Sequence, residues 1–293
     1  SGGTMNTARQ RLGAAGTVTA AIAFGGISPS TTAVTESYDG STWTEVNDLN
    51  TARRSMAGTG IQTSAILGGG FSTANVNAAE TWDGTNWTEV SEINTARRSA
   101  AGVGTSPSAL IAGGFTSTYT AVVEYWNGSS WTEVNDLNTP RGEAAGAGSY
   151  PAGVVFGGNA PSGVVGNTET WNGTSWTEVN DLNSARTGLG GSGTTTSALG
   201  YAGESPGTTR FTSTESWDGT SWTEVNDLPV GKNTSAGAGP SNSIALNCAG
   251  DGPAVTGTSE EWTFSGLPPS TPAAGYSDAI TGQMYYNSTT GQF

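Results

Sequence analysis

The 293-residue sequence contains no histidine and a single cysteine, Cys248. Most zinc and copper sites in proteins need imidazole or several thiolates, and Ser-His-Asp and Cys-His catalysis needs a histidine. We therefore expect no catalytic centre of these classes, no metal site and no cofactor. One cysteine cannot form an intrachain disulfide, and Cys248 lies in an apolar stretch that favours a core position over a nucleophile.

Basic residues are also scarce. Ten Lys and Arg stand against 24 Asp and Glu, which gives a formal net charge of −14. Binding to nucleic acid generally requires a basic footprint, so we expect no nucleic-acid partner. No apolar run reaches the ~18 residues that a membrane-spanning helix needs, so no membrane span is expected.

What the sequence does contain is an internal repeat. A basic residue recurs with spacings of 44, 44, 44, 45 and 46 at Arg9, Arg53, Arg97, Arg141, Arg186 and Lys232. A glutamate recurs in step at Glu36, Glu80, Glu124, Glu169, Glu215 and Glu260, and a tryptophan follows it by seven residues in the first five copies. Six copies of one supersecondary unit indicate a repeat fold in which neighbouring units bury each other's faces. We expect the periodic glutamate to accept backbone or arginine hydrogen bonds inside or between blades.

Within one copy the pattern predicts four short strands, at residues 54–61, 64–69, 79–82 and 87–90. An Asp-Gly or Asn-Gly pair separates the last two in the first five copies, as in a hairpin turn with positive φ. Four antiparallel strands in about 45 residues, repeated six times, predict an all-β, six-bladed propeller.

A glycine pair after an apolar strand, then Glu-x-Tyr or Glu-x-Trp, then tryptophan, resembles the kelch repeat over residues 1–265. The fifth and sixth copies depart from it, with Ala202-Gly203 and Ala249-Gly250 in place of the pair. The resemblance implies a kelch-like propeller. Some kelch-type propellers are copper radical oxidases whose metal is held by histidine and tyrosine, and the lack of histidine excludes that activity here.

The recurring segment WTEVNDLNTAR resembles sequences in kelch-like structural proteins of marine bacteriophages. Residues 282–287 resemble a short stretch of phage fibre and other virion proteins. This resemblance implies a location on the exterior of a virion, with other virion proteins as partners and a host surface glycan or receptor as a further partner.

The chain ends predict how the ring closes. The sixth copy has no Trp-Thr-Glu-Val segment of its own, whereas residues 1–5 align with the end of an outer strand. We expect this N-terminal strand to complete the last blade, which would protect an open sheet edge. Residues 266–293 then form a C-terminal linker and attachment tail, through which the chain could form a homo-oligomer.

Nine of the ten cations lie between an outer strand and the next inner strand, and alternating strand direction places these connections and the loops after each second strand on one face. Two interpretations stay open. The periodic cations pair with Asp48, Asp136, Asp181 or Asp227 nearby, or they form a cationic ring at the channel mouth that admits an anion, a carboxylated glycan or an acidic loop. The predicted binding residues are Arg9, Arg53, Arg97, Arg141, Arg186 and Lys232.

The loops after the second strands differ in length and sequence, whereas the rest of each repeat is nearly identical from copy to copy. They span residues 27–34, 71–78, 115–122, 159–168, 204–214 and 251–259. Variable loops on a rigid scaffold are where specificity usually resides. They supply four candidate binding aromatics: Phe71, Phe115, Tyr119 and Phe211.

The sequence favours a non-catalytic virion structural or appendage protein, in a phage tail, a fibre or capsid decoration, that presents a propeller for host attachment or protein docking. Two alternatives remain. One is a secreted or cell-surface glycan-binding lectin, which would be extracellular. The other is a polysaccharide-degrading enzyme with a pair of catalytic carboxylates among its 24 acids.

Overall fold

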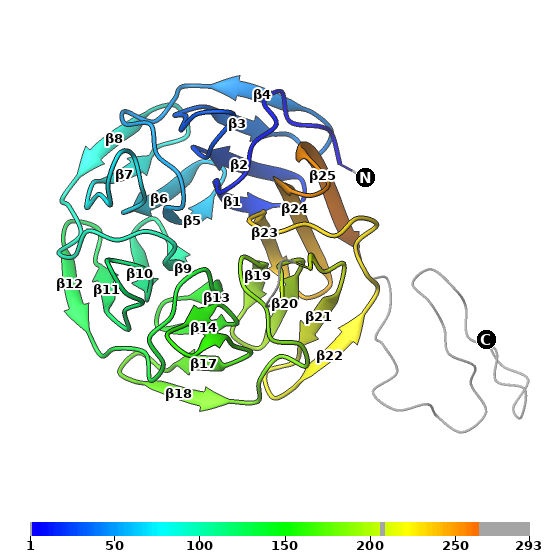
Figure 1. Cartoon of the computed structure of the whole chain (residues 1–293). Helices are drawn as coiled ribbons and strands as arrows, with labels where there is room; N and C mark the ends of the chain where they lie inside the picture. Colours follow the sequence, from blue (N-terminus) through cyan, green and yellow to red (C-terminus); the bar gives the residue numbers. More distant parts are fainter. Residues whose placement is uncertain (1, 206–208, 264–293) are drawn as a thin grey trace, which may run out of the picture.

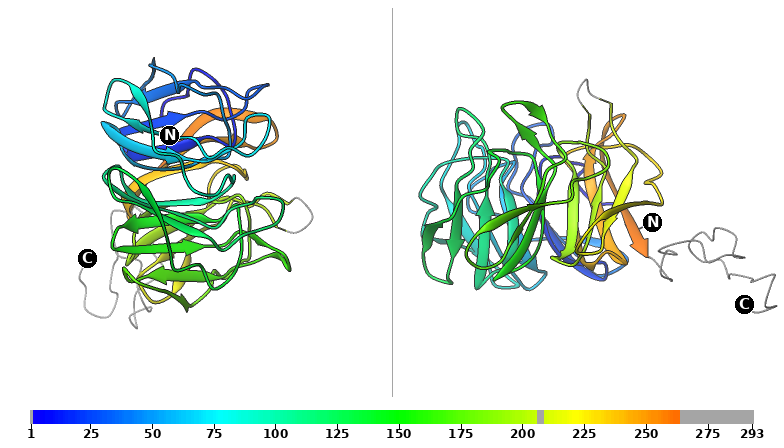
Figure 2. Two further views of the ribbon diagram at one scale, coloured as in Figure 1. Left: turned by 90° about the vertical axis from the view of Figure 1, so that its left-hand side faces the viewer. Right: turned by 90° about the horizontal axis from the view of Figure 1, so that it is seen from below.

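The computed structural model describes residues 2–205 and 209–263, which form a ring of six antiparallel sheets around a central axis (Figure 1). Seen edge-on, the connections between strands project from both faces of the ring (Figure 2). The predicted six-bladed propeller is confirmed. The described residues form strands but no helix, and hence no apolar helix that could cross a membrane.

Each blade runs from the axis outward in chain order. The innermost strands are β1 (Gly13–Thr17), β5 (Ala57–Ile61), β9 (Ala101–Thr105), β13 (Ala145–Ser149), β19 (Gly190–Thr194) and β23 (Ala236–Ser241). The second strands are β2 (Ala20–Phe24), β6 (Ser64–Gly68), β10 (Ser108–Ala112), β14 (Ala152–Phe156), β20 (Ser197–Tyr201) and β24 (Ile244–Asp251).

The third strands are β3 (Thr35–Tyr38), β7 (Ala79–Trp82), β11 (Val123–Trp126), β17 (Thr168–Trp171), β21 (Thr214–Trp217) and β25 (Val255–Thr263). The outer strands are β4 (Trp43–Val46), β8 (Trp87–Val90), β12 (Trp131–Val134), β18 (Trp176–Val179) and β22 (Trp222–Val225). A small hairpin of β15 (Asn159–Ala160) and β16 (Gly163–Val164) is added in blade four.

The innermost strands consist of small residues because they crowd around the axis. A Cβ added to Gly102 on β9 would lie 2.6 Å from the backbone oxygen of Gly58 on β5, and one added to Gly146 on β13 would lie 2.6 Å from the oxygen of Gly102. Contacts of this kind link the inner strands of adjacent blades. Glycine is therefore required here for close approach, although it costs conformational entropy elsewhere in a strand.

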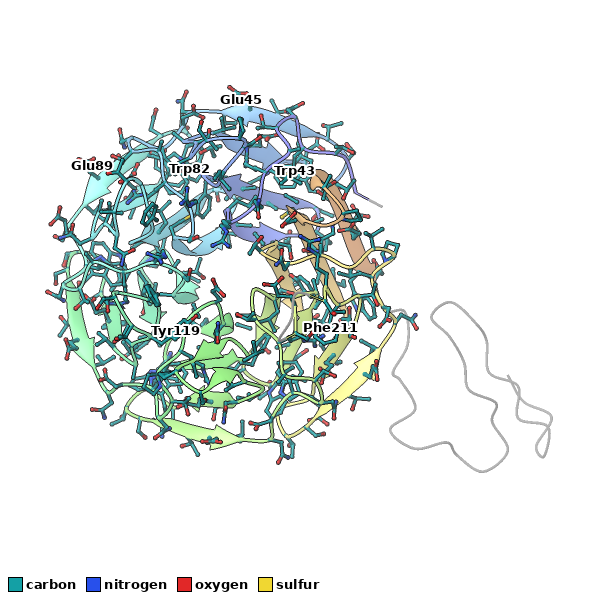
Figure 3. The ribbon with its side chains drawn as sticks, viewed as in Figure 1. Trp43, Glu45, Trp82, Glu89, Tyr119 and Phe211 are labelled. Carbon is teal, nitrogen blue, oxygen red and sulfur yellow. The ribbon has the colours of Figure 1, made fainter. Side chains whose placement is uncertain are left out.

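The apolar core lies between blades. Phe24 of blade one packs against Trp87 of blade two with ring centroids 5.0 Å apart, in a cluster that also contains Leu49 and Trp82. The tryptophan at the start of each outer strand is buried. Figure 3 labels one of them, Trp43, together with Trp82 at the end of the third strand β7, and both lie within the ring. Burial between neighbours explains why single blades do not form alone.

The blade-six sheet contains three strands, β23, β24 and β25, and residues 2–5 run beside β25 without forming a strand (Figure 1). The Met5 N–H donates to the Gly257 carbonyl at 2.8 Å, and the Met5 side chain is buried in a cluster with Leu246 and Cys248 of blade six and Tyr38 of blade one. The N-terminal segment thus supplies the expected closing contact.

One predicted loop is wrong. Residues 251–259 were expected to form the variable loop of blade six, but β24 continues to Asp251 and β25 begins at Val255. The two strands pair almost to the turn, with a register shift between Cys248 and Gly250. The predicted tail at residues 266–293 lies outside the described residues.

Candidate functional site

The six periodic cations are buried ion-pair partners. Each pairs with the periodic glutamate on the third strand of its own blade, and the two side chains are fully or almost fully removed from solvent in the first five blades. The pairs are Arg9–Glu36, Arg53–Glu80, Arg97–Glu124, Arg141–Glu169, Arg186–Glu215 and Lys232–Glu260.

Blade three shows how one pair ties a blade together. Arg97 Nη1 donates to Glu124 Oε1 at 2.5 Å, and Arg97 Nη2 donates to the Ile111 carbonyl at 3.1 Å. Glu124 Oε2 also accepts the backbone N–H and the side-chain amide of Asn94 at 2.6 and 2.7 Å. Burial lowers the pKa of the Arg97 guanidinium, and the glutamate opposes that shift. The pair therefore anchors the incoming connection to the second and third strands.

These contacts correct the predicted binding residues. The prediction of a cationic ring open to a ligand is wrong, because all six residues are at most 1% exposed: Arg9, Arg53, Arg97, Arg141, Arg186 and Lys232. The alternative prediction, that the periodic cations pair with a nearby aspartate of the same connection, is also wrong. Asp48, Asp136 and Asp181 instead accept the backbone N–H groups of Thr35, Val123 and Thr168. The pairing of the periodic glutamate with arginine is confirmed.

The mouth of the axial channel on the variable-loop face is a closed ring of backbone hydrogen bonds. At one position per blade, the N–H donates to the carbonyl of the equivalent residue in the preceding blade, at 2.7 to 3.0 Å. All six members have φ between 50° and 63°, where side chains other than hydrogen are disfavoured. This channel-mouth ring consists of Arg11, Ser55, Ser99, Glu143, Gly188 and Thr234.

The side chains just outside this ring form an arginine–aromatic ladder, by which we mean Arg54, Phe71, Arg98, Phe115 and Tyr119. The Arg54 and Arg98 guanidinium carbons lie 4.7 and 5.2 Å from the centroid of Phe71, and Arg98 lies 4.6 Å from that of Phe115. Phe115 and Tyr119 meet edge to face at 5.2 Å. Stacked cations and rings of this kind are worth about 0.5 to 1 kcal/mol per pair at exposed sites.

Hydrogen bonds fix the two arginines of the ladder. Arg54 Nη1 donates to Thr31 Oγ1 at 2.9 Å, and Arg98 Nη1 donates to Asn75 Oδ1 at 2.8 Å. Both acceptors lie in the variable loop of the preceding blade. Desolvation raises the pKa of Tyr119, and the charge of Glu143 adds to that shift. The ladder is therefore ordered and only partly exposed.

The opposite half of the same face is acidic. Backbone bridges pair Arg54 with Phe71 and Arg98 with Phe115, whereas the equivalent bridges in blades five and six pair Thr187 with Glu204 and Asn233 with Asp251. Here Asp251 accepts a hydrogen bond from Arg210 at 2.8 Å. A symmetric scaffold thus carries a cationic, aromatic half over blades one to three and an acidic half over blades four to six.

The four predicted aromatics separate into two groups. Phe71, Phe115 and Tyr119 come together in the ladder, whereas Phe211 lies in blade five, away from Tyr119 (Figure 3). Sequence reasoning selected Arg53 and Arg97 and passed over their neighbours Arg54 and Arg98. The sequence does contain a pattern that distinguishes Arg53 and Arg97 from Arg54 and Arg98. A side chain that recurs in every copy serves the fold, and one that occurs in only some copies is free to serve a ligand.

The outer rim of the ring carries exposed glutamates, whereas small residues line its axis. Glu45 and Glu89 project from the outer strands at the periphery of the ring (Figure 3), and their equivalents in blades three to five are also exposed. The axial cavity of about 210 Å³ is lined mainly by the glycine and alanine residues of the innermost strands. Within residues 2–205 and 209–263, no three acidic or thiol side chains converge as metal ligands.

No family model matches the chain, and no curated protein matches it. The fold is similar to that of a solved propeller, titled "Structure of YjhT", with a TM-score of 0.75 over 89% of this chain and 96% of that chain. The two sequences are 11% identical, so this likeness concerns the fold alone.

Proposed function

We propose that the chain is a non-catalytic, kelch-like propeller on the exterior of a virion, where its variable-loop face attaches the particle to a host surface or docks another protein. The observation that carries this proposal is the contrast between repeats that are nearly copied and one face that breaks their symmetry. Variable loops on a rigid scaffold are where binding residues are usually placed.

The arrangement of the ladder supports a binding role. Aromatic side chains and arginine dominate the energetics of many protein interfaces. Phe71, Arg98 and Phe115 are already stacked and hydrogen-bonded through neighbouring loops, so little side-chain entropy remains to be lost on binding. The surrounding acidic rim would disfavour association through other surfaces.

The experiment that tests this role is competition for adsorption. Excess purified chain should slow adsorption to the host by virus particles whose genome encodes this chain. Antibody against the chain should label those particles. Phe71→Ser with Phe115→Ser should abolish the competition. Ile61→Ser is the matched control, because Ile61 is 50% exposed at the end of β5 that leads to the opposite face.

Other outcomes would replace the proposal. Binding to a glycan array without any labelling of particles would identify a lectin. New reducing ends after incubation with host envelope polysaccharide would identify an enzyme. Competition that survives loss of both phenylalanines would place the attachment surface elsewhere on the ring.

A further inference from the structure

A hollow of about 360 Å³ opens beside the channel mouth, where blades one and two meet. Three arginines line it, Arg11, Arg54 and Arg98, together with the ring of Phe71 and the polar side chains of Gln10 and Ser55. None of its lining residues is acidic. Three positive charges thus share one small concave surface in a chain whose net charge is −14.

These guanidinium groups are not neutralised by the fold. Arg54 and Arg98 lie over the same phenylalanine ring, and each donates one of its five N–H groups to an uncharged side chain, Thr31 or Asn75. The Arg11 side chain forms no hydrogen bond or ion pair with the described part of the chain. Like charges that line one hollow repel each other, and an anion bound in the hollow would reduce that repulsion.

The other cations of the chain are committed elsewhere. Six lie in the buried pairs described above, and Arg210 pairs with Asp251 on the acidic half of the face. The positions equivalent to Arg54 and Arg98 in blades four to six are Gly142, Thr187 and Asn233. The hollow is therefore the one place, within residues 2–205 and 209–263, where several cations without acidic partners converge.

We propose that Arg11, Arg54 and Arg98 bind a tetrahedral oxyanion, the sulfate or phosphate ester group of a larger ligand. Three guanidinium groups match the three free oxygens of such an ester better than the two oxygens of a carboxylate. Phe71 provides an apolar surface for the carbon part of the ligand next to the ester. The proposal deepens the attachment role and rests on it for the identity of the larger ligand.

The test is calorimetric titration of the purified chain with sodium sulfate, sodium phosphate and sodium acetate at constant ionic strength. Sulfate and phosphate should bind saturably at one site per chain, and acetate should bind more weakly. A sulfated disaccharide and glycerol phosphate then distinguish the two ester sources. Equal responses to all three salts, or no saturable heat, would overturn the proposal.

The variants locate the site. Arg54→Gln and Arg98→Gln should each weaken sulfate and phosphate binding by about tenfold, because each removes charge-assisted hydrogen bonds to the anion. Arg98→Lys keeps the charge without the planar fork and should fall between. Arg210→Gln is the matched control, an exposed cation on the same face, and should bind as the unaltered chain does. Weakening of the same size in this control would mean that the anions respond only to net charge.

The two proposals fail separately. Loss of anion binding in Arg98→Gln with undiminished competition for adsorption would remove the oxyanion site and leave the attachment role in place. If the chain binds anions normally, but does not compete for adsorption and its antibody does not label particles, the attachment role is removed and the oxyanion site stays in place. Melting temperatures of the variants should stay close to that of the unaltered chain, because the side chains of the hollow are only partly buried.

Discussion

In blades two and three, the periodic arginine and the arginine that follows it have opposite roles. Arg97 is 1% exposed and paired with Glu124, whereas Arg98 is half-buried on the surface and stacked on two phenylalanines. A buried charge is tolerated only with a partner, because removal from water costs several kcal/mol per ion. Adjacent residues of one type therefore differ in what their loss should do.

Arg97→Met should lower the free energy of unfolding by about 3 to 5 kcal/mol, because it leaves the Glu124 carboxylate buried without its cation. Arg98→Met, at the neighbouring position, should cost only about 1 to 2 kcal/mol, through the loss of two stacking contacts at the surface. Urea denaturation of both variants measures the difference. Equal losses would show that Arg97 is not the residue that holds the blade.

The outer tryptophans reveal a second difference between copies. Trp87 Nε1 donates to Thr35 Oγ1 at 3.1 Å and Trp222 Nε1 to Thr168 Oγ1 at 3.0 Å, each in the preceding blade. Trp176 Nε1 is buried without a partner, and Val123 occupies the equivalent of those threonines. An unpaired buried donor costs about 1 to 3 kcal/mol.

Val123→Thr should therefore raise the free energy of unfolding by about 1 kcal/mol, since the new hydroxyl would accept from Trp176 Nε1. Thr168→Val, the reverse change one blade further on, should lower it by a similar amount through the loss of the Trp222 hydrogen bond. Thermal unfolding of the two variants tests both signs. A destabilised Val123→Thr variant would mean that the hydroxyl is buried without reaching the indole.

At the scale of the element, the inner strands determine how tightly the ring closes. Glycine stands at the second and fourth positions of β5, β9, β13 and β23, because each of these strands faces the backbone of its neighbour around the axis. Overpacking of a well-packed region costs about 1 to 3 kcal/mol, and neither backbone can move without displacing the rest of the ring.

Gly102→Ala should lower the melting temperature, because the new Cβ would lie 2.6 Å from the Gly58 oxygen, too close for a nonbonded carbon–oxygen pair without a shift of the strands. The loss should be about 1 to 3 kcal/mol. Gly252→Ala is the control, since its nearest neighbour would be an oxygen at an ordinary 3.5 Å. Circular dichroism melts of the two variants separate close approach from the general effect of losing a glycine.

At the scale of the whole molecule, closure brings the two ends of the described chain together. The Tyr38 hydroxyl donates to Glu261 Oε1 at 2.7 Å, and Trp43 Nε1 donates to Ser259 Oγ at 3.1 Å, so blade one is tied to blade six. Met5 fills the cluster between them. Cys248 lies in this cluster, fully buried, and burial raises the pKa of its thiol to about 12.

Cys248 therefore reports on the closure. At pH 8 its thiol is protonated and inaccessible, so a thiol reagent should label it only when blade six opens. Met5→Ala should cost about 2 to 5 kcal/mol and accelerate labelling under native conditions. Leu137→Ala removes a similarly buried side chain at the equivalent position before blade four and should not accelerate labelling by local opening. Equal labelling rates in both variants would show that the N-terminal segment does not prevent local opening of blade six.

The repeat, and with it the fold, follows from the amino-acid sequence alone. Near-identical units of about 45 residues, each with one face to bury, allow only an arrangement in which neighbours cover one another, and positions such as Asp83-Gly84 mark their turns. The expected strands at 79–82 and 87–90 coincide with β7 and β8. Periodicity also identified the glutamates as hydrogen-bond acceptors, because a feature shared by all copies serves what all copies need.

Which cations face solvent depends on packing between strands that are distant in the chain. Arg53 and Arg54 are adjacent in the chain, and one points into the blade toward Glu80 while the other lies over Phe71. Whether a side chain is buried depends on the second and third strands that pass above it, which lie 14 to 27 residues away in the sequence. The same holds for the division of the face into a cationic half and an acidic half, because that contrast appears only once six copies are placed around one axis.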